Sequence, residues 1–93
     1  MYLLRQQTSN TSGNQLAVFI RRPVAVFPEG VYGAATLGIE VKPKGGTEWK
    51  RLADAIFNAT TNEPVMLNIG GYFIRGYVEN ADGNTALNLR IVN

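Results

Sequence analysis

The sequence predicts an all-β protein, a small antiparallel β-sandwich of seven to eight short strands with an immunoglobulin-like or jelly-roll-like topology. Three observations predict this class. Apolar and polar residues alternate along most of the chain, no long stretch has helical spacing, and turn-forming residues recur at short intervals. Strands with one buried side are typical of antiparallel sheets, and many short strands are typical of sandwiches. The 93 residues make one domain, 1–93.

The N-terminal element is open to two interpretations. Tyr2, Leu3 and Leu4 precede a polar, uncharged run at residues 6–15. Residues 1–14 are then either a long loop or an arm that carries the three apolar side chains outward onto a neighbouring subunit. If the segment is an arm, deleting the residues before Gly13 leaves the sandwich folded, whereas loss of a core strand unfolds it.

The strands that follow are predicted from alternating apolar positions. The residues expected to face the core are, in order, Leu16, Val18 and Ile20; Val24 and Val26; Leu37, Ile39 and Val41; Val65, Leu67 and Ile69; Ile74 and Val78; and Leu87, Leu89 and Ile91. Trp49 and Leu52 have an odd spacing, which predicts a short strand with a bulge or a strand end. Residues 53–55 are the only helical candidate, and they are too few to favour a helix.

Turn-forming residues separate these strands at 28–30, 43–46, 61–64, 70–71 and 82–84. The Asp82-Gly83 pair is typical of a tight β-hairpin, because both residues tolerate a positive φ. Glycine pairs at 45–46 and 70–71 lead into strands. They therefore lack the following helix that a phosphate-binding loop needs.

The composition argues against catalysis. Histidine and cysteine are absent, which removes the commonest general base and metal ligand, and any disulfide or thiolate site. The seven acidic residues fall in turns or at outward strand positions, Glu40 among them. We expect no enzymatic activity, no cofactor and no metal. The start of the chain does not resemble a signal peptide, and no apolar run reaches membrane-spanning length, so we expect no membrane partner.

The net charge of +2 is small, and the basic residues are scattered along the sequence. This pattern does not predict a nucleic-acid partner. Phe73, Arg75 and Tyr77 share a predicted outward face, and such a patch suits a protein interface better than a base-stacking platform. The candidate partner-binding residues are Tyr2, Leu3, Leu4, Arg21, Arg22, Phe73, Arg75 and Tyr77.

Four features beyond residue 30 occur in a particular order. They are a Gly-Ala-rich strand entry at 33–37, a Gly-Gly hairpin ahead of Trp49, a Tyr/Arg strand at 71–77, and a last strand after the turn at 82–83. In these features residues 31–92 resemble the small β-sandwich proteins encoded among the virion structural genes of tailed bacteriophages. The N-terminal third does not share the likeness.

This resemblance implies a structural protein of the virion, made in the host cytoplasm and placed on the capsid exterior or the tail. The expected role is a capsid decoration (cement) protein that binds major capsid subunits, stabilises the shell and forms homo-oligomers on the particle. The alternatives are a tail, collar or head-fibre accessory protein, or a carbohydrate- or receptor-binding module. In the last case Tyr32, Trp49, Tyr72 and Tyr77 are candidates for stacking on sugar rings, although we expect Trp49 to fill the core.

Overall fold

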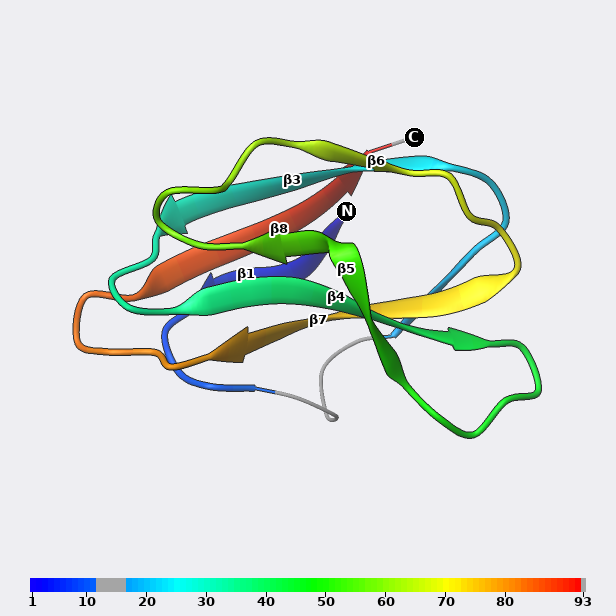
Figure 1. Ribbon diagram of the computed structural model, residues 1–93, viewed down its shortest axis with the longest axis horizontal. Coiled ribbons are helices and arrows are strands. Elements are labelled where there is room, and N and C mark those ends of the chain that lie inside the picture. Colours follow the sequence, from blue (N-terminus) through cyan, green and yellow to red (C-terminus); the bar gives the residue numbers. More distant parts are fainter. Residues whose placement is uncertain (12–16, 93) are drawn as a thin grey trace.

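The computed structural model describes residues 1–11 and 17–92, and it confirms an all-β sandwich. Eight strands form two four-stranded antiparallel sheets that pack face to face (Figure 1). The strands are β1 (Tyr2–Gln7), β2 (Val18–Ile20), β3 (Val24–Val31), β4 (Thr36–Pro43), β5 (Lys50–Phe57), β6 (Val65–Leu67), β7 (Tyr72–Glu79) and β8 (Ala86–Val92). Within the described residues, no helix is long and apolar enough to cross a membrane.

The strand order selects one of the two expected topologies. The first sheet has the order β1-β8-β3-β6 and the second has the order β2-β7-β4-β5. Each strand of the first half of the chain therefore pairs with one of the second half: β1 with β8, β2 with β7, β3 with β6 and β4 with β5. A long antiparallel ribbon wound into two layers in this way is a jelly roll. An immunoglobulin-like sandwich would instead place the first two strands in the same sheet.

The hydrophobic core lies between the sheets and contains most of the residues predicted for it. The inward positions of β4, β7 and β8 are almost completely buried: Leu37, Ile39, Ile74, Val78, Leu87 and Leu89. On β6, Leu67 is buried, whereas Val65 and the following Ile69 are only half-buried. Leu16 lies outside the described residues.

Both interpretations of the N-terminal segment, the outward arm and the long loop, are wrong for residues 2–7. Tyr2–Gln7 is strand β1, which pairs with β8, and Leu3 and Leu4 are each only 4% exposed within the core. Adjacent residues of a regular strand point to opposite faces, but the register slips between Tyr2 and Leu4, and this bulge turns both leucines inward. Further along, the backbone of Thr11 exchanges two hydrogen bonds with Val78 on β7. Residues 12–14 of the supposed arm lie outside the described part of the chain.

Two predicted turns have a different role in the structure. Residues 28–30 continue β3 and do not form a turn. Pro28 has no backbone N–H to donate, and it lies beyond Val24–Val26, the only part of β3 that pairs with β6. The turn at 82–84 exists, with Thr85 N–H donating to Asp82 O at 3.2 Å, but it connects β7 of one sheet to β8 of the other. It is therefore not a hairpin.

The β4–β5 hairpin matches its prediction more closely. Gly46 N–H donates to Pro43 O at 2.9 Å, and Gly45 has a φ of 82°, a conformation that favours glycine. The register of β5 against β4 slips between Gly38 and Glu40, which confirms the irregularity expected near Leu52. The expected short strand is wrong, since β5 is eight residues long and begins after Trp49. Residues 53–55, the helical candidate, belong to β5.

Candidate functional site: a face of aromatic rings and cations

The outer face of the second sheet gathers several of the predicted partner-binding residues. We call it the aromatic–cation face, and it consists of Phe19, Arg21, Lys42, Lys44, Trp49, Arg51, Phe73, Arg75 and Tyr77, together with Glu40 and Glu79. Register explains the assembly, because directly opposite residues of antiparallel strands have neighbouring side chains. Phe73 lies opposite both Phe19 and Lys42, Arg75 lies opposite Glu40, and Glu40 lies opposite Arg51.

One half of this face is an ion-pair cluster formed by Glu40, Arg51, Arg75 and Glu79. The two carboxylate oxygens of Glu40 accept hydrogen bonds from different arginines: Oε1 accepts from Arg75 Nε at 2.8 Å, and Oε2 accepts from Arg51 Nε at 3.4 Å. Arg51 also pairs with Glu79. The centre of the cluster is buried, since the side chain of Glu40 is only 9% exposed and that of Arg75 only 12%, whereas Arg51 and Glu79 at its edge are 45% and 44% exposed. Two acids and two arginines make this half electrically neutral.

Tyr77 and Arg75 do not form the exposed patch that alternation predicts. The Tyr77 side chain points outward but is only 1% exposed, because its ring covers Gly38 on β4 and the Arg51 guanidinium lies 4.1 Å from the ring centroid. Burial raises the pKa of the Tyr77 phenol. Likewise Glu40, predicted to be solvated, is buried beneath its arginines. These residues form a third layer over the sheet rather than an open contact surface.

Trp49 does not fill the core as expected. It is half-buried on the outer face, where the Arg75 guanidinium carbon lies 4.1 Å from its ring centroid and Lys42 Nζ lies at 5.2 Å. Such contacts attract a cation to the negative face of the ring. Trp49 therefore lies between the ion-pair cluster, through Arg75, and the other half of the face, through Lys42.

The other half is a hollow of about 270 Å³ lined by Phe19, Arg21, Lys44 and Phe73, which we call the basic hollow. The two phenylalanine rings meet edge to face, with centroids 4.9 Å apart. Arg21 and Lys44 lie over Phe19 at 5.7 and 6.0 Å, and Lys42 Nζ, beside the hollow, lies 5.6 Å from the centre of Phe73. Three cations thus surround one aromatic pair.

None of these three cations takes part in an ion pair with any residue that the structure describes. Together they carry +3, more than the net charge of +2 of the whole chain. The expectation that basic residues do not cluster is therefore wrong at this place. Arg21 follows β2, whereas Lys42 lies near the end of β4 and Lys44 just after it, and the strand order β2-β7-β4 brings these two segments together.

The remaining predicted residues are placed elsewhere. Arg22 is exposed after β2, and Tyr2 is half-buried on the outer face of the first sheet, where Arg5 lies 5.1 Å from its ring centroid. That outer face carries the apolar side chains of Ala25, Phe27, Met66 and Val92 beside Tyr2, and we call it the apolar face after them, although it also holds Arg5, Arg90 and Glu29. Register places Ala25 opposite both Met66 and Val92, and Phe27 opposite Arg90.

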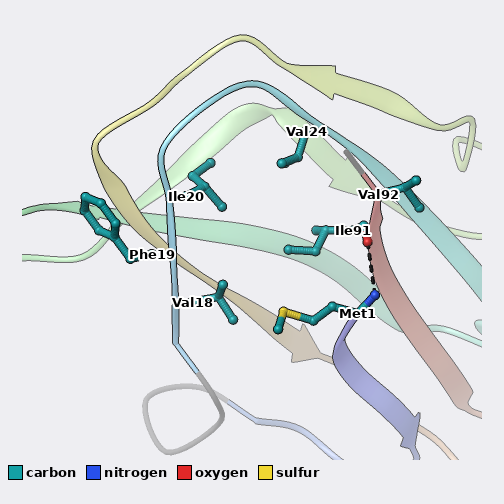
Figure 2. A pocket seen from close by; sticks show the side chains of 7 residues that line it. All are labelled: Met1, Val18, Phe19, Ile20, Val24, Ile91 and Val92. Carbon is teal, nitrogen blue, oxygen red and sulfur yellow. Dashed lines mark hydrogen bonds between the residues drawn. The ribbon is translucent and has the colours of Figure 1, made fainter.

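A second hollow, of about 250 Å³, lies where the chain begins (Figure 2). In this view Val18 and Ile20 point toward Met1, Val24 and Ile91, while Phe19 points away from them. The amino group of Met1 donates a hydrogen bond to Ile91 O at 3.3 Å. The side chains that line the hollow are all apolar, so it offers no polar side chain to orient a ligand.

A third hollow, of about 620 Å³, lies beside the β4–β5 hairpin, and its lining includes Thr47, Glu48, Lys50, Leu52 and Tyr72. It contains one of the four aromatic residues considered for sugar stacking. The others are dispersed: Tyr77 is covered by Arg51, and Tyr32 is so buried that the pKa of its phenol rises to about 12.

Phe19, Lys42 and Lys44 were not predicted as site residues from the sequence pattern. Alternation does place Phe19 and Lys42 on outward faces, but only the order β2-β7-β4 makes them neighbours. Among the described residues, no group of three or more acidic side chains could hold a metal ion. No family model, no curated protein and no solved structure matches this chain.

Proposed function

We propose that this chain is a non-catalytic structural protein of a tailed-bacteriophage particle, a decoration protein that binds major capsid subunits and stabilises the shell. The phage assignment rests on the likeness of residues 31–92 to small virion β-sandwich proteins. The binding role rests on one observation above all: ordered aromatic and basic side chains lie outside the core, on the aromatic–cation face. Aromatic residues and arginine are enriched at protein interfaces.

Attachment through outer faces suits a thin sandwich of this kind. Trp49 packs against the Arg75 guanidinium, 4.1 Å from its ring centroid, so we expect less side-chain freedom to be lost when a partner binds beside it. The apolar face offers a second contact surface, on which Met66 is 58% exposed. One surface for a capsid subunit and one for a neighbouring copy would give the oligomers that we expect on the particle.

The test is the composition and strength of purified particles. The proposal predicts that this chain is present in a fixed copy number, in symmetric positions on the capsid exterior. Particles that lack it should open at a lower temperature, and adding the purified chain should restore the original value. Its presence in infected-cell lysate but never in particles would contradict the proposal.

A carbohydrate- or receptor-binding role at a tail or fibre is the second candidate. The hollow beside the β4–β5 hairpin favours it, because it combines Tyr72 with the polar side chains of Thr47, Glu48 and Lys50. A glycan array with the wild type and the Tyr72→Ala and Trp49→Ala variants tests this role. Loss of a glycan signal with Tyr72→Ala alone would support the hollow, provided that circular dichroism shows a folded variant.

A further inference from the structure

We propose that the basic hollow binds a carboxylate-rich surface of a partner protein, with Arg21, Lys42 and Lys44 as the contacting cations. The inference deepens the proposed function, on which it rests in one respect: the partner is a protein of the particle. It concerns only this half of the aromatic–cation face. The ion-pair cluster supplies its own counter-charges and needs none from a partner.

Charge complementarity is the first argument. Arg21 and Lys44 line the hollow, Lys42 lies beside it, and the three cations pair with no described acid. The three cations lie 5.6 to 6.0 Å from the centroids of the two phenylalanine rings, and these contacts attract them without neutralising their charge. A like-charged cluster held in this way lowers its electrostatic energy when it binds an anionic surface, and such complementarity speeds and orients association.

The chemistry of the site favours carboxylates over a stacked ligand. Single-stranded nucleic acids and sugars bind to open aromatic faces, but here two cations lie over Phe19 and one over Phe73. Three cations are also few for a nucleic-acid backbone, since proteins that bind DNA strongly contact roughly six to ten phosphates. Acidic side chains need only the exposed cationic ends.

The size of the hollow agrees with this choice. Its volume of about 270 Å³ lies just below the range of roughly 300–1,000 Å³ that is typical of small-molecule pockets. The hollow therefore suits the ends of acidic side chains from a larger partner. Arg21 and Lys44 are both exposed, so a protein surface can reach them without displacing any part of the sandwich.

The experiment uses the full chain and two labelled probes, poly-L-glutamate and single-stranded oligothymidylate with the same number of charges. The site variant is Arg21→Gln/Lys44→Gln, and the matched control is Arg5→Gln/Arg22→Gln, at two exposed arginines outside the hollow that pair with no described acid. Both remove two positive charges, and the control also removes one cation from an aromatic ring, that of Tyr2. A third variant, Arg21→Lys/Lys44→Arg, keeps the charges. Circular dichroism establishes that every variant is folded.

We expect poly-L-glutamate to bind the site variant about tenfold more weakly than the wild type, and the control and the charge-preserving variant within about twofold. Binding should also weaken between about 50 and 200 mM salt, because these charges are exposed. Equal losses in the site variant and the control would overturn the inference, since net charge alone would then explain binding. Tighter binding of oligothymidylate than of poly-L-glutamate would overturn it in favour of nucleic acid.

Particle binding separates this inference from the proposed function. If the site variant attaches to particles as well as the control does, the decoration role stands and the inference fails. If poly-L-glutamate binding depends on the hollow but the chain never occurs on particles, the inference about acidic surfaces stands and the decoration role fails.

Discussion

The two outer faces of this sandwich differ in what covers them. On the second sheet, Tyr77, Trp49 and the ion-pair cluster form a layer above the strands, and β4 is buried on both sides over most of its length. On the first sheet, β8 keeps the simple alternation of buried and accessible residues. Its apolar face has one weak ion pair, in which Arg90 and Glu29 are 3.7 Å apart.

The contrast shows that one sheet of a sandwich can be covered on both faces while the outer face of the other sheet stays accessible. Residue types still alternate along β4, but its outward Gly38 and Glu40 are buried as well as its inward side chains, so burial no longer alternates there, whereas it does along β8. The covering layer also neutralises half of the aromatic–cation face and leaves the basic hollow charged. Four predictions test this contrast, beginning with the largest expected effect.

Inner and outer positions of the first sheet should differ most. Leu4→Ala removes a buried core side chain from β1 and should lower the free energy of unfolding by about 3 kcal/mol. Met66→Ala, on the exposed apolar face, should change it by less than about 0.5 kcal/mol. Urea denaturation followed by circular dichroism measures both values. A small loss with Leu4→Ala would show that β1 contributes little to the core.

The same acid-to-amide change should have unequal costs on the two faces. Glu40→Gln leaves the largely buried Arg75 without its carboxylate and should cost about 2 kcal/mol. Glu29→Gln is the matched control, and it should cost less than about 0.5 kcal/mol because the Arg90–Glu29 pair is more than 40% exposed on each side. Fluorescence of the single tryptophan should shift only in the first variant. Equal costs would contradict the contrast between the two faces.

The layer over the second sheet depends on a glycine beneath Tyr77. A Cβ at Gly38 would overlap the Tyr77 ring, so Gly38→Ala should displace the ring and cost about 1.5 kcal/mol. Gly83→Ala is the control, since nothing lies within 4 Å of a Cβ there, and we expect a change within about 0.5 kcal/mol. Thermal unfolding compares the two. If Gly38→Ala proves neutral, Tyr77 does not pack rigidly on the sheet.

The smallest effect concerns the turn at residues 82–84, which connects β7 of the second sheet to β8 of the first sheet and should stabilise both sheets. The backbone N–H groups of Asn84 and Ala34 donate to the Asp82 carboxylate, each at 2.9 Å, and these bonds lower its pKa. The pKa of Asp82 is lower in the folded state than in the unfolded state. The ionised carboxylate therefore stabilises the fold fully above the unfolded pKa of about 3.9, and this stabilisation is lost as the pH falls through the folded-state pKa.

The Asp82→Asn variant tests this linkage. Wild type should be more stable than the variant at about pH 7, and the difference should shrink at about pH 2.5. Unfolding midpoints at the two pH values provide the measurement. A difference that stays constant with pH would show that the charged form of Asp82 is not what stabilises the turn.

Much of the fold was predictable from local patterns, whereas the site was largely not. Leu37, Ile39, Leu87 and Leu89 were assigned to the core correctly, because alternation records which side of a strand is buried. The prediction failed for Leu3 and Leu4, since a bulge reverses the orientation of one of two adjacent residues and has no clear signal in the sequence.

The sequence by itself determined the class of this protein: a small β-sandwich without histidine or cysteine, with its strands marked by periodicity and its turns by glycine and proline. Only the tertiary structure decided that the topology is a jelly roll and that Arg21, Lys42 and Lys44 meet around two phenylalanine rings. The reason is physical. Alternation depends on a strand and the core beneath it, whereas a surface cluster depends on which strands become neighbours, and that is set by packing across the whole chain.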